Sequence, residues 1–224
     1  MKLSPRLAAI ARMIPRNARL CDAASDHAYL PIYLIQTGAV CSCIASDISV
    51  PCVARARENA ARAGVEDVLA IRLSDGLKEI SPDECDCISM SGLGGETIIG
   101  ILEASPWALD GEHLLILQPA SRANLLRRWL YDHDCGILDE QVIRDAGRLY
   151  PLFSARAGVG EIPPEDERAF FAYASRALLD RAEAGEEEPV AYIRRLAGLL
   201  RKEQGHDEHY MSIVLEIVIR TKQQ

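Results

Sequence analysis

The chain has 224 residues, of which 49% are apolar, and a formal net charge of −8. That length suits one enlarged α/β domain, or one α/β domain with an appendage. No apolar stretch is long enough to cross a bilayer, and the first residues form no sustained apolar run, so we expect neither a membrane anchor nor a signal peptide. Seven cysteines without the spacing of a disulfide framework favour a reducing cytosol, and hence a cytoplasmic location.

The charge is unevenly distributed. Residues 1–20 carry five basic side chains and no acidic one, whereas residues 161–190 carry nine acidic side chains against three basic ones. The acidic average argues against indiscriminate nucleic-acid binding, but a local basic face would permit an RNA substrate. A solvated helix face explains the same basic residues equally well. These residues are Lys2, Arg6, Arg12, Arg16 and Arg19.

Strands and helices alternate along most of the chain. Ser4 and Pro5 predict a helix start, with a cap followed by a first-turn proline. A short apolar strand then ends at Asp22. Further strands are predicted at residues 41–46, 68–73, 85–90 and 113–117. Further helices are predicted at residues 28–36, from residue 51 to the glycine at 64, from the SGLGGETI segment to about residue 104, and at residues 122–131. Residues 136–144 and 149–156 indicate an antiparallel hairpin. This pattern predicts an α/β fold with a doubly wound, mostly parallel sheet.

Glycines and prolines at residues 158–164 mark a change of composition. We therefore expect one domain over residues 1–157 and a small C-terminal helical region over residues 158–224. Phe170, Ala174 and Ala177 mark one helix of that region, and apolar residues between Val190 and Leu200 mark another. Their spacing predicts a helical hairpin or a short coiled coil. The β-branched run at residues 213–219 fits either a helix or a strand.

The most informative segment is RLCDAASDHAYLP, at residues 19–31. A strand, a short turn and a helix of this kind present free backbone N–H groups at the carboxyl end of the first strand of an α/β sheet. Here the turn also carries Asp22, Asp26 and His27 within six residues, which predicts a binding site. An ordinary turn with solvated side chains is the alternative.

The acidic residues at the strand ends favour a cofactor without phosphates. Asp47 follows Asp22 by 25 residues, near the spacing at which a carboxylate accepts hydrogen bonds from a ribose diol. Asp75 ends the third strand, where it can receive an adenine amino group. No G-x-G-x-x-G follows the first strand, and Asp26 would repel a pyrophosphate. These features favour S-adenosylmethionine, which is cationic, over a nicotinamide dinucleotide.

The cysteines and two late histidines do not predict a metal site. Cys41/Cys43 and Cys85/Cys87 are C-x-C pairs, and the period of a strand places both members of a pair on one face. Buried structural thiols are the favoured interpretation. His206 and His209 stand beside acidic residues without a further cysteine or histidine nearby, which is typical of a solvated helix start.

Five segments resemble the bacterial tRNA adenine-22 N1-methyltransferases, a family of class I methyltransferases. The segments occur in the family's order and spacing across roughly residues 3–157. SDHAYLP is the most specific of them, whereas GLGG alone is common. The segments are LSPRLAAIARMIP at residues 3–15, SDHAYLP at 25–31, SGLGGETI at 91–98, LILQP at 115–119 and GRLY at 147–150.

The resemblance implies a Rossmann-like fold, S-adenosylmethionine as the cofactor and tRNA as the partner. It assigns Asp47 to the ribose and Asp75 to the adenine of that cofactor. The loop after the fourth strand is where the methyl donor would meet the base. The remaining expected cofactor contacts are Asp22, Ser25 and Asp26 in the first turn, Gly76 beside Asp75, and Ser91 and Gly92 in the loop, which continues through Gly94 and Gly95.

Methylation of adenine N1 needs little acid–base chemistry, because N1 has an in-plane lone pair and no proton. Catalysis then depends on alignment and on a site that tolerates the cation formed on the base. Gln118 is a candidate to hydrogen-bond the base edge. His27 is a candidate substrate contact, and a helix-capping or core histidine is the alternative. N1 lies on the pairing edge, so the target base must be unpaired or extruded.

The chain departs from the family pattern at Ala24, where the family has glycine, and at Pro151, where it usually has glutamate. Three hypotheses follow: a tRNA adenine N1-methyltransferase, a relative that binds S-adenosylmethionine without catalysis, or a methyltransferase of small molecules. The sequence leaves the oligomeric state open.

Overall fold

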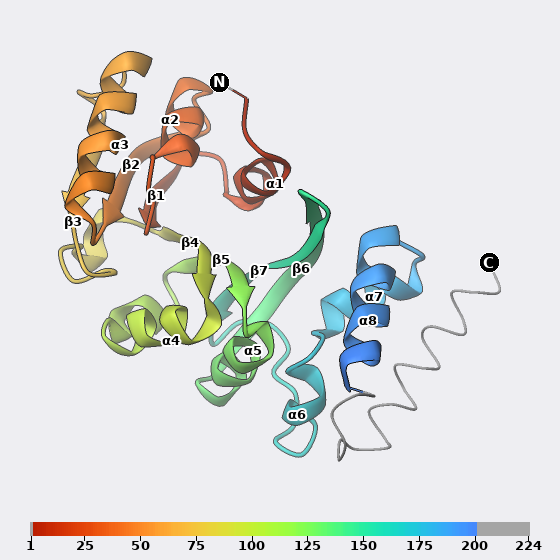
Figure 1. Cartoon of the computed structure of the whole chain (residues 1–224). Helices are drawn as coiled ribbons and strands as arrows, with labels where there is room; N and C mark the ends of the chain where they lie inside the picture. Colours follow the sequence, from red (N-terminus) through yellow and green to blue (C-terminus); the bar gives the residue numbers. More distant parts are fainter. Residues whose placement is uncertain (1, 201–224) are drawn as a thin grey trace.

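The computed structural model describes residues 2–200, in which seven strands form a single sheet of order β3-β2-β1-β4-β5-β7-β6 (Figure 1). The strands are β1 (Ala18–Ala23), β2 (Val40–Asp47), β3 (Leu69–Leu73), β4 (Cys87–Gly94), β5 (Leu114–Ser121), β6 (Cys135–Asp145) and β7 (Arg148–Ala157). The helices are α1 (Pro5–Met13), α2 (Tyr29–Gln36), α3 (Val50–Ala63), α4 (Gly95–Glu103), α5 (Ala123–Asp132), α6 (Arg168–Phe171), α7 (Arg176–Glu183) and α8 (Glu187–Leu200), with short 3-10 turns at Pro82–Glu84 and Pro106–Leu109.

The first five strands are parallel, and β7 runs antiparallel to both β5 and β6. The strand order reverses between β1 and β4, which is where α/β sheets of this kind bind ligands. The predicted Rossmann-like sheet with a closing hairpin is therefore confirmed, and it places the turn after β1 at the centre of the sheet.

Local sequence explains where several helices begin and end. The side chain of Ser4 accepts a hydrogen bond from Leu7 N (3.3 Å) at the start of α1, and Ser49 does the same for Cys52 N (3.5 Å) at the start of α3. Helix α3 ends where Gly64 adopts a left-handed conformation (φ +67°). These capping residues fix the lengths of the helices beside the sheet.

Two hydrophobic cores lie on opposite faces of the sheet. In Figure 1, α1, α2 and α3 cover one face, and α4 and α5 cover the other. Neighbouring strand residues alternate between the two cores: Leu20 and Cys87 pack toward α1–α3, whereas Cys21 and Ile88 pack toward α4 and α5. Both faces of the parallel strands are thus buried, which explains their nearly continuous apolar sequences.

The cysteine pairs do not follow the expected arrangement. Cys85 precedes β4 and belongs to the α4/α5 core, whereas Cys87 belongs to the core on the other face. The prediction of a common face is wrong for this pair, because the strand begins two residues later than expected. The thiol of Cys85 hydrogen-bonds Cys21. In the other pair, Cys43 is buried and Cys41 is exposed.

The C-terminal region begins with two short helices where one was expected. Ser175 separates α6 from α7, since its side chain accepts a hydrogen bond from Leu178 N (3.2 Å) and starts a new helix. Helices α7 and α8 contact each other and lie against β6 (Figure 1), and Leu178 and Ile193 share a core with Phe153 of the sheet. The domain boundary after residue 157 stays a prediction. The run at 213–219, His206 and His209 lie outside the described residues.

Pro151 occupies an interior strand, where a proline is unusual. It pairs with Val142 of β6, but the pairing of β7 with β5 reaches only from Ala155 to Phe153. Pro151 therefore lies beyond the last residue that pairs with β5, where its missing N–H removes no bond to that strand. Between residues 2 and 200, no helix is both long and apolar enough to span a membrane.

Candidate functional site

The carboxyl ends of β1, β2 and β3 are joined by backbone hydrogen bonds. Ser25 N donates to Ser46 O (2.9 Å), and Ser74 N donates to Asp47 O (2.9 Å). The N–H of Asp26 donates to the Asp47 carboxylate (3.0 Å). Residues that the sequence analysis assigned to separate parts of the site thus lie at one edge of the sheet.

The turn after β1 has an unusual backbone. Ala24, Asp26 and Ala28 all adopt left-handed conformations, with φ of +56°, +52° and +56°. Such a conformation costs an ordinary residue roughly 1–2 kcal/mol, and residues of this kind concentrate at functional sites. Ala24 therefore reaches the conformation that glycine favours, although it carries a methyl group. Alanine in place of the family's glycine therefore adds strain to the turn, but the turn still adopts the same backbone conformation.

Asp22 is a buried carboxylate at the end of β1, with 4% of its surface exposed. Burial raises its pKa to about 6, although hydrogen bonds from the hydroxyls of Ser25 (2.6 Å) and Ser89 (2.5 Å) favour the ionised form. Ser89 is fully buried on β4 and was missed by the sequence analysis. The signal was a hydroxyl inside the otherwise apolar segment CISM.

Asp47 has acceptor capacity left for a ligand. One of its oxygens accepts from Asp26 N (3.0 Å) and the other from Ser49 N (2.9 Å). An ionised carboxylate offers about four lone-pair positions, so each oxygen can accept one more hydrogen bond. Ile48, the next residue, is 67% exposed and offers an apolar surface beside this carboxylate. Ile48 could not be predicted from the sequence, because an isolated apolar residue at a strand end gives no pattern.

The turn after β3 holds Asp75 and Gly76. Asp75 is exposed and lies 2.5 Å from the ammonium of Lys78. Gly76 has a φ of +62°, and a Cβ there would lie 2.8 Å from the side chain of Ile101. The hydroxyl of Ser74 donates to Gly76 O (2.9 Å) and closes the turn. Glycine is required at this position for both its backbone conformation and its contact with α4.

Gln118 positions the carboxyl end of β4, because the loop expected at residues 91–94 is the last, irregular part of that strand. It is completely buried on β5, and its side-chain oxygen accepts a hydrogen bond from Gly92 N (3.2 Å). Its side-chain nitrogen donates to Pro119 O (2.8 Å). The amide that was expected to meet the base edge thus already holds Gly92, which has a φ of +78° and open space around it. Ser91 is half-buried at the same strand end.

The start of α4 is packed closely against the loop that follows β5. A Cβ on Gly95 would meet Arg122 O, and one on Gly94 would lie 3.4 Å from Ser121 Oγ. The two glycines therefore let the β4–α4 and β5–α5 connections touch through their backbones.

His27 lies at the entrance to α2. Its Nε2 is 3.4 Å from the Asp26 carboxylate, and its ring is tilted against Tyr29 at a centroid distance of 5.3 Å. Its carbonyl accepts a hydrogen bond from Asn59 (3.0 Å). Its Nδ1 is buried without a hydrogen-bond partner among the described residues. A buried polar atom of this kind requires a partner, and a ligand can supply one.

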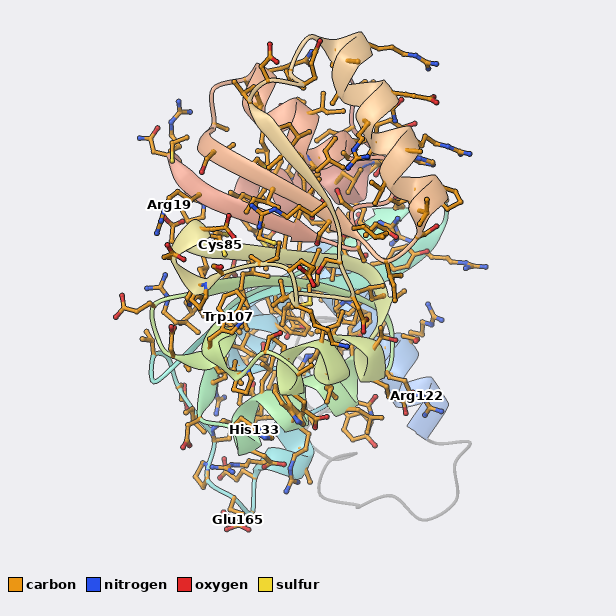
Figure 2. All side chains as sticks on the ribbon, turned by 90° about the vertical axis from the view of Figure 1, so that its left-hand side faces the viewer. Arg19, Cys85, Trp107, Arg122, His133 and Glu165 are labelled. Carbon is orange, nitrogen blue, oxygen red and sulfur yellow. The ribbon has the colours of Figure 1, made fainter. Side chains whose placement is uncertain are left out.

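Two arginines of the basic first segment, Arg19 and Arg6, have different partners. Arg19 lies at the amino end of β1, where its Nε is 3.2 Å from the Asp86 carboxylate. In Figure 2, Arg19 lies on the opposite side of the molecule from Arg122, which follows the carboxyl end of β5. Arg6, by contrast, lies over the ring of Tyr150 at 5.2 Å from its centroid. That the arginines of this segment form a set that faces RNA stays a prediction.

The edge as a whole is acidic. Asp22, Asp26, Asp47 and Asp75 come from the ends of the first three strands, and only Asp75 has a lysine partner among the described residues. Negative charge of this density disfavours a pyrophosphate and favours a ligand with cationic groups and a diol. Within residues 2–200, no cluster of three or more histidines, cysteines and carboxylates is placed to hold a metal ion.

This fold is that of a methyltransferase domain. Residues 3–153 match a family described as a methyltransferase domain, and the chain belongs to that family. The prediction of a class I methyltransferase is confirmed.

The more specific similarity is to enzymes of tRNA. The tRNA (adenine(22)-N(1))-methyltransferase of Bacillus subtilis (strain 168) is 37% identical over 158 residues, which cover 70% of this chain and 66% of that protein. A Streptococcus pneumoniae protein, proposed to be a tRNA (m1A22) methyltransferase and solved in complex with S-adenosyl-L-methionine, is 28% identical with a TM-score of 0.80 over 99% of both chains. The solved B. subtilis m1A22 tRNA methyltransferase is also 28% identical, with a TM-score of 0.70 over 99% of this chain and 98% of that one.

Proposed function

We propose that this protein transfers a methyl group from S-adenosylmethionine to N1 of adenine 22 in tRNA. The observation that carries the proposal is the 37% identity to the B. subtilis enzyme of that activity. The likeness to the cofactor-bound Streptococcus pneumoniae protein covers 99% of the chain and supports the same cofactor. We expect the protein in the cytoplasm, where tRNA is found.

The residues at the acidic edge fit S-adenosylmethionine. The remaining lone pairs of Asp47 suit the two ribose hydroxyls, and exposed Ile48 suits one face of the adenine. Asp75 and Gly76 lie at the next strand end, beside the expected adenine position. The buried carboxylate of Asp22, with Ser25 and Asp26, suits the cationic methionine end.

When bound, the cofactor supplies an electrophilic methyl group on a sulfonium. The adenine N1 lone pair forms the new N–C bond as the S–C bond breaks, so the positive charge moves to the base and no proton is transferred. The protein must align the two atoms and accept the new cation. The end of β4 at Ser91 and Gly92 permits close approach, since even a Cβ on Gly92 would meet nothing within 4 Å. Asp26 and the other carboxylates favour the charge that forms.

We assign His27 and Gln118 to the side of the site that holds the target adenine of the tRNA. The unpartnered Nδ1 of His27 supports a contact with substrate. Gln118 supports the reaction by holding Gly92 in place, and a contact with the base edge would require its amide to exchange one of its present partners.

The test incubates the protein with labelled S-adenosylmethionine and total tRNA, followed by digestion and identification of the labelled nucleoside. The proposal predicts 1-methyladenosine. Cofactor binding without any labelled product would favour a non-catalytic relative. Label that enters only small metabolites would favour a small-molecule methyltransferase, the alternative to which the net charge of −8 points.

A further inference from the structure

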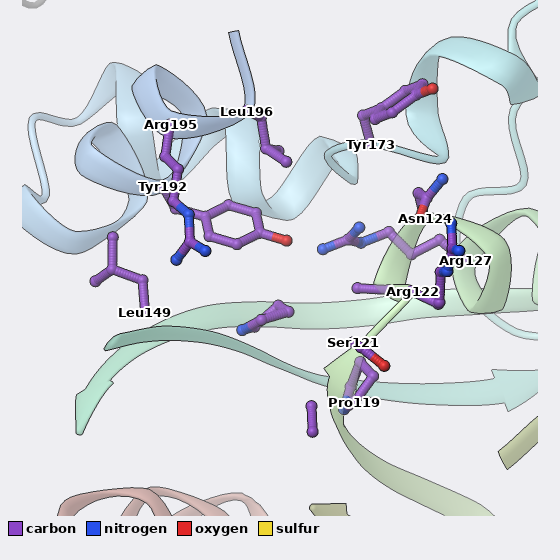
Figure 3. Close-up of a pocket in the computed structure, with 13 residues that line it drawn as sticks. Pro119, Ser121, Arg122, Asn124, Arg127, Leu149, Tyr173, Tyr192, Arg195 and Leu196 are labelled. Atoms are coloured by element: carbon purple, nitrogen blue, oxygen red, sulfur yellow. The ribbon is translucent and has the colours of Figure 1, made fainter. Parts of the chain in front are cut away.

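A cavity lies beside the proposed active site, between the β5–α5 loop, the start of β7 and helix α8 (Figure 3). Its volume is about 300 Å³. None of the residues assigned above to cofactor or catalysis lines it. The residues that matter here are Ser121, Arg122, Leu149, Pro151, Tyr192, Arg195 and Leu196.

Two arginines give the cavity an uncompensated positive charge. Arg122 and Arg195 are exposed, and neither has a carboxylate partner within residues 2–200. Arg127, a third lining residue, is by contrast engaged: it is buried with Glu140 (3.1 Å from Nε to the carboxylate) and donates to Ala172 O (3.0 Å). Two free guanidiniums on one cavity of an acidic protein favour an anion, and guanidinium geometry matches phosphate.

The rest of the lining suits a nucleobase. Leu149, Pro151 and Leu196 supply apolar surface, and the ring of Tyr192 reaches from α8 toward Arg127 (Figure 3). The Tyr192 side chain hydrogen-bonds Arg127 and is thereby held in place. A volume of about 300 Å³ is at the lower end of ligand sites, which indicates one nucleotide rather than a longer segment.

The position of the cavity connects it to the reaction. Ser121 and Arg122 line it, and these residues touch Gly94 and Gly95, where β4 leads into α4 beside the proposed position of the target base. Enzymes that act on an extruded base also contact the nucleotides that flank it. The cavity lies where a flanking nucleotide of the target adenine would be within reach.

We propose that this cavity binds one unpaired nucleotide of the RNA strand, next to the target adenine, with its phosphate on Arg122 and Arg195 and its base against the apolar wall. The proposal rests on the proposed function, because it takes tRNA as the substrate. It adds α8 and the β5–α5 loop to the RNA-binding surface.

The experiment measures tRNA affinity over a salt series for the parent, R122Q, R195Q and R195K. Arg194→Gln is the matched control, because Arg194 is an exposed arginine on the same helix that does not line the cavity. Each Gln variant should flatten the slope of log affinity against log salt by about 0.7, as expected for one lost phosphate contact on a single strand. R195K and R194Q should keep the parental slope, and S-adenosylmethionine affinity should be unchanged in all variants.

Failure of this proposal is distinguishable from failure of the proposed function. If the parent methylates tRNA and R122Q and R195Q keep both its salt slope and its affinity, the cavity does not bind RNA phosphate. An equal loss in R194Q would also overturn the proposal, because the effect would then belong to general surface charge. If the parent neither binds nor methylates tRNA, the proposed function itself is wrong.

Discussion

The backbone N–H of Asp26 donates a hydrogen bond to the side-chain carboxylate of Asp47, at a distance of 3.0 Å. This bond joins the turn after β1 to the end of β2, so the residue assigned to the ribose also fixes the turn assigned to the methionine end. The two halves of the proposed cofactor site are therefore coupled through a single carboxylate.

Replacing Asp47 with alanine should weaken S-adenosylmethionine binding by roughly 1.5–3 kcal/mol, the scale of a hydrogen bond to a charged group. The loss has two sources, the ribose acceptor and the anchor of the Asp26 turn. Calorimetric titration measures it. Asp83→Ala is the control, because Asp83 is an exposed aspartate outside the site and should keep the parental affinity. Equal affinities in parent and D47A would remove Asp47 from the site.

Asp22 should make stability fall as the pH rises. Its pKa is raised to about 6 in the folded chain from 3.8, so the folded chain holds this proton more tightly than the unfolded chain. The contribution to stability is present below about pH 4 and is lost as the pH approaches 6. The difference between the two pKa values corresponds to a change in the free energy of unfolding on the order of 3 kcal/mol. Urea unfolding measures the free energy of unfolding of the parent and of D22N at each pH across this range. The difference between the two proteins should change with pH by this amount, and a constant difference would contradict the prediction.

Cofactor affinity should show the opposite pH dependence. A cationic ligand favours ionised Asp22, so affinity should rise as the pH passes from 5 to 7, by up to about tenfold per unit below the pKa. The variant D22N should lose that dependence. A binding profile that D22N leaves unchanged would place the cationic end of the cofactor elsewhere.

Ala24→Gly separates a working enzyme from a non-catalytic relative. Glycine removes the strain of an alanine at φ +56°, which should offset the greater freedom of the unfolded chain and leave stability within about 1 kcal/mol of the parent. Because the turn already has this conformation, cofactor affinity and tRNA methylation should stay within a few-fold. An inactive parent that becomes active as A24G would show that the methyl group had disabled the enzyme. Ala24→Val should be clearly less stable than either, because a branched side chain fits this conformation poorly.

Gly95 and Gly100 lie on the same helix and should respond oppositely to alanine. A Cβ on Gly95 would collide with Arg122 O, so G95A should lose about 1–3 kcal/mol of unfolding free energy. A Cβ on Gly100 meets nothing within 4 Å, so G100A should gain about 0.5–1 kcal/mol from helix propensity. Denaturant unfolding checks both. A tolerated G95A would mean that the two loops can move apart without loss.

The sequence predicted the fold well because each local signal agreed with the next. Alternating strands and helices, the cap at Ser4 and the stop at Gly64 all appear where the pattern placed them, and α3 begins one residue before its predicted start. The errors came where a boundary depended on tertiary contacts. Cys85 lies outside β4, and Ser175 divides an apolar pattern that reads as one helix.

The site was predictable only in part. Asp22 and Asp47 are found by their place at strand ends, but the burial of Gln118 and its bond to Gly92 depend on how β4 and β5 pair. Ser89 meets Asp22 across 67 residues of sequence, and Tyr192 of α8 meets Arg127 of α5. No spacing in the chain encodes these contacts, since they arise from strands and helices that are distant in sequence.

The central claim is tested most directly by locating the methyl group on the RNA. Two tRNA transcripts that differ only in carrying adenine or guanine at position 22 are incubated with the protein and S-adenosylmethionine, then copied by primer extension. Because a methyl group on N1 blocks base pairing, the account predicts a stop at position 22 on the adenine transcript and full-length copies of the guanine transcript. Full-length copies of both transcripts, or a stop at another position on both, would contradict it.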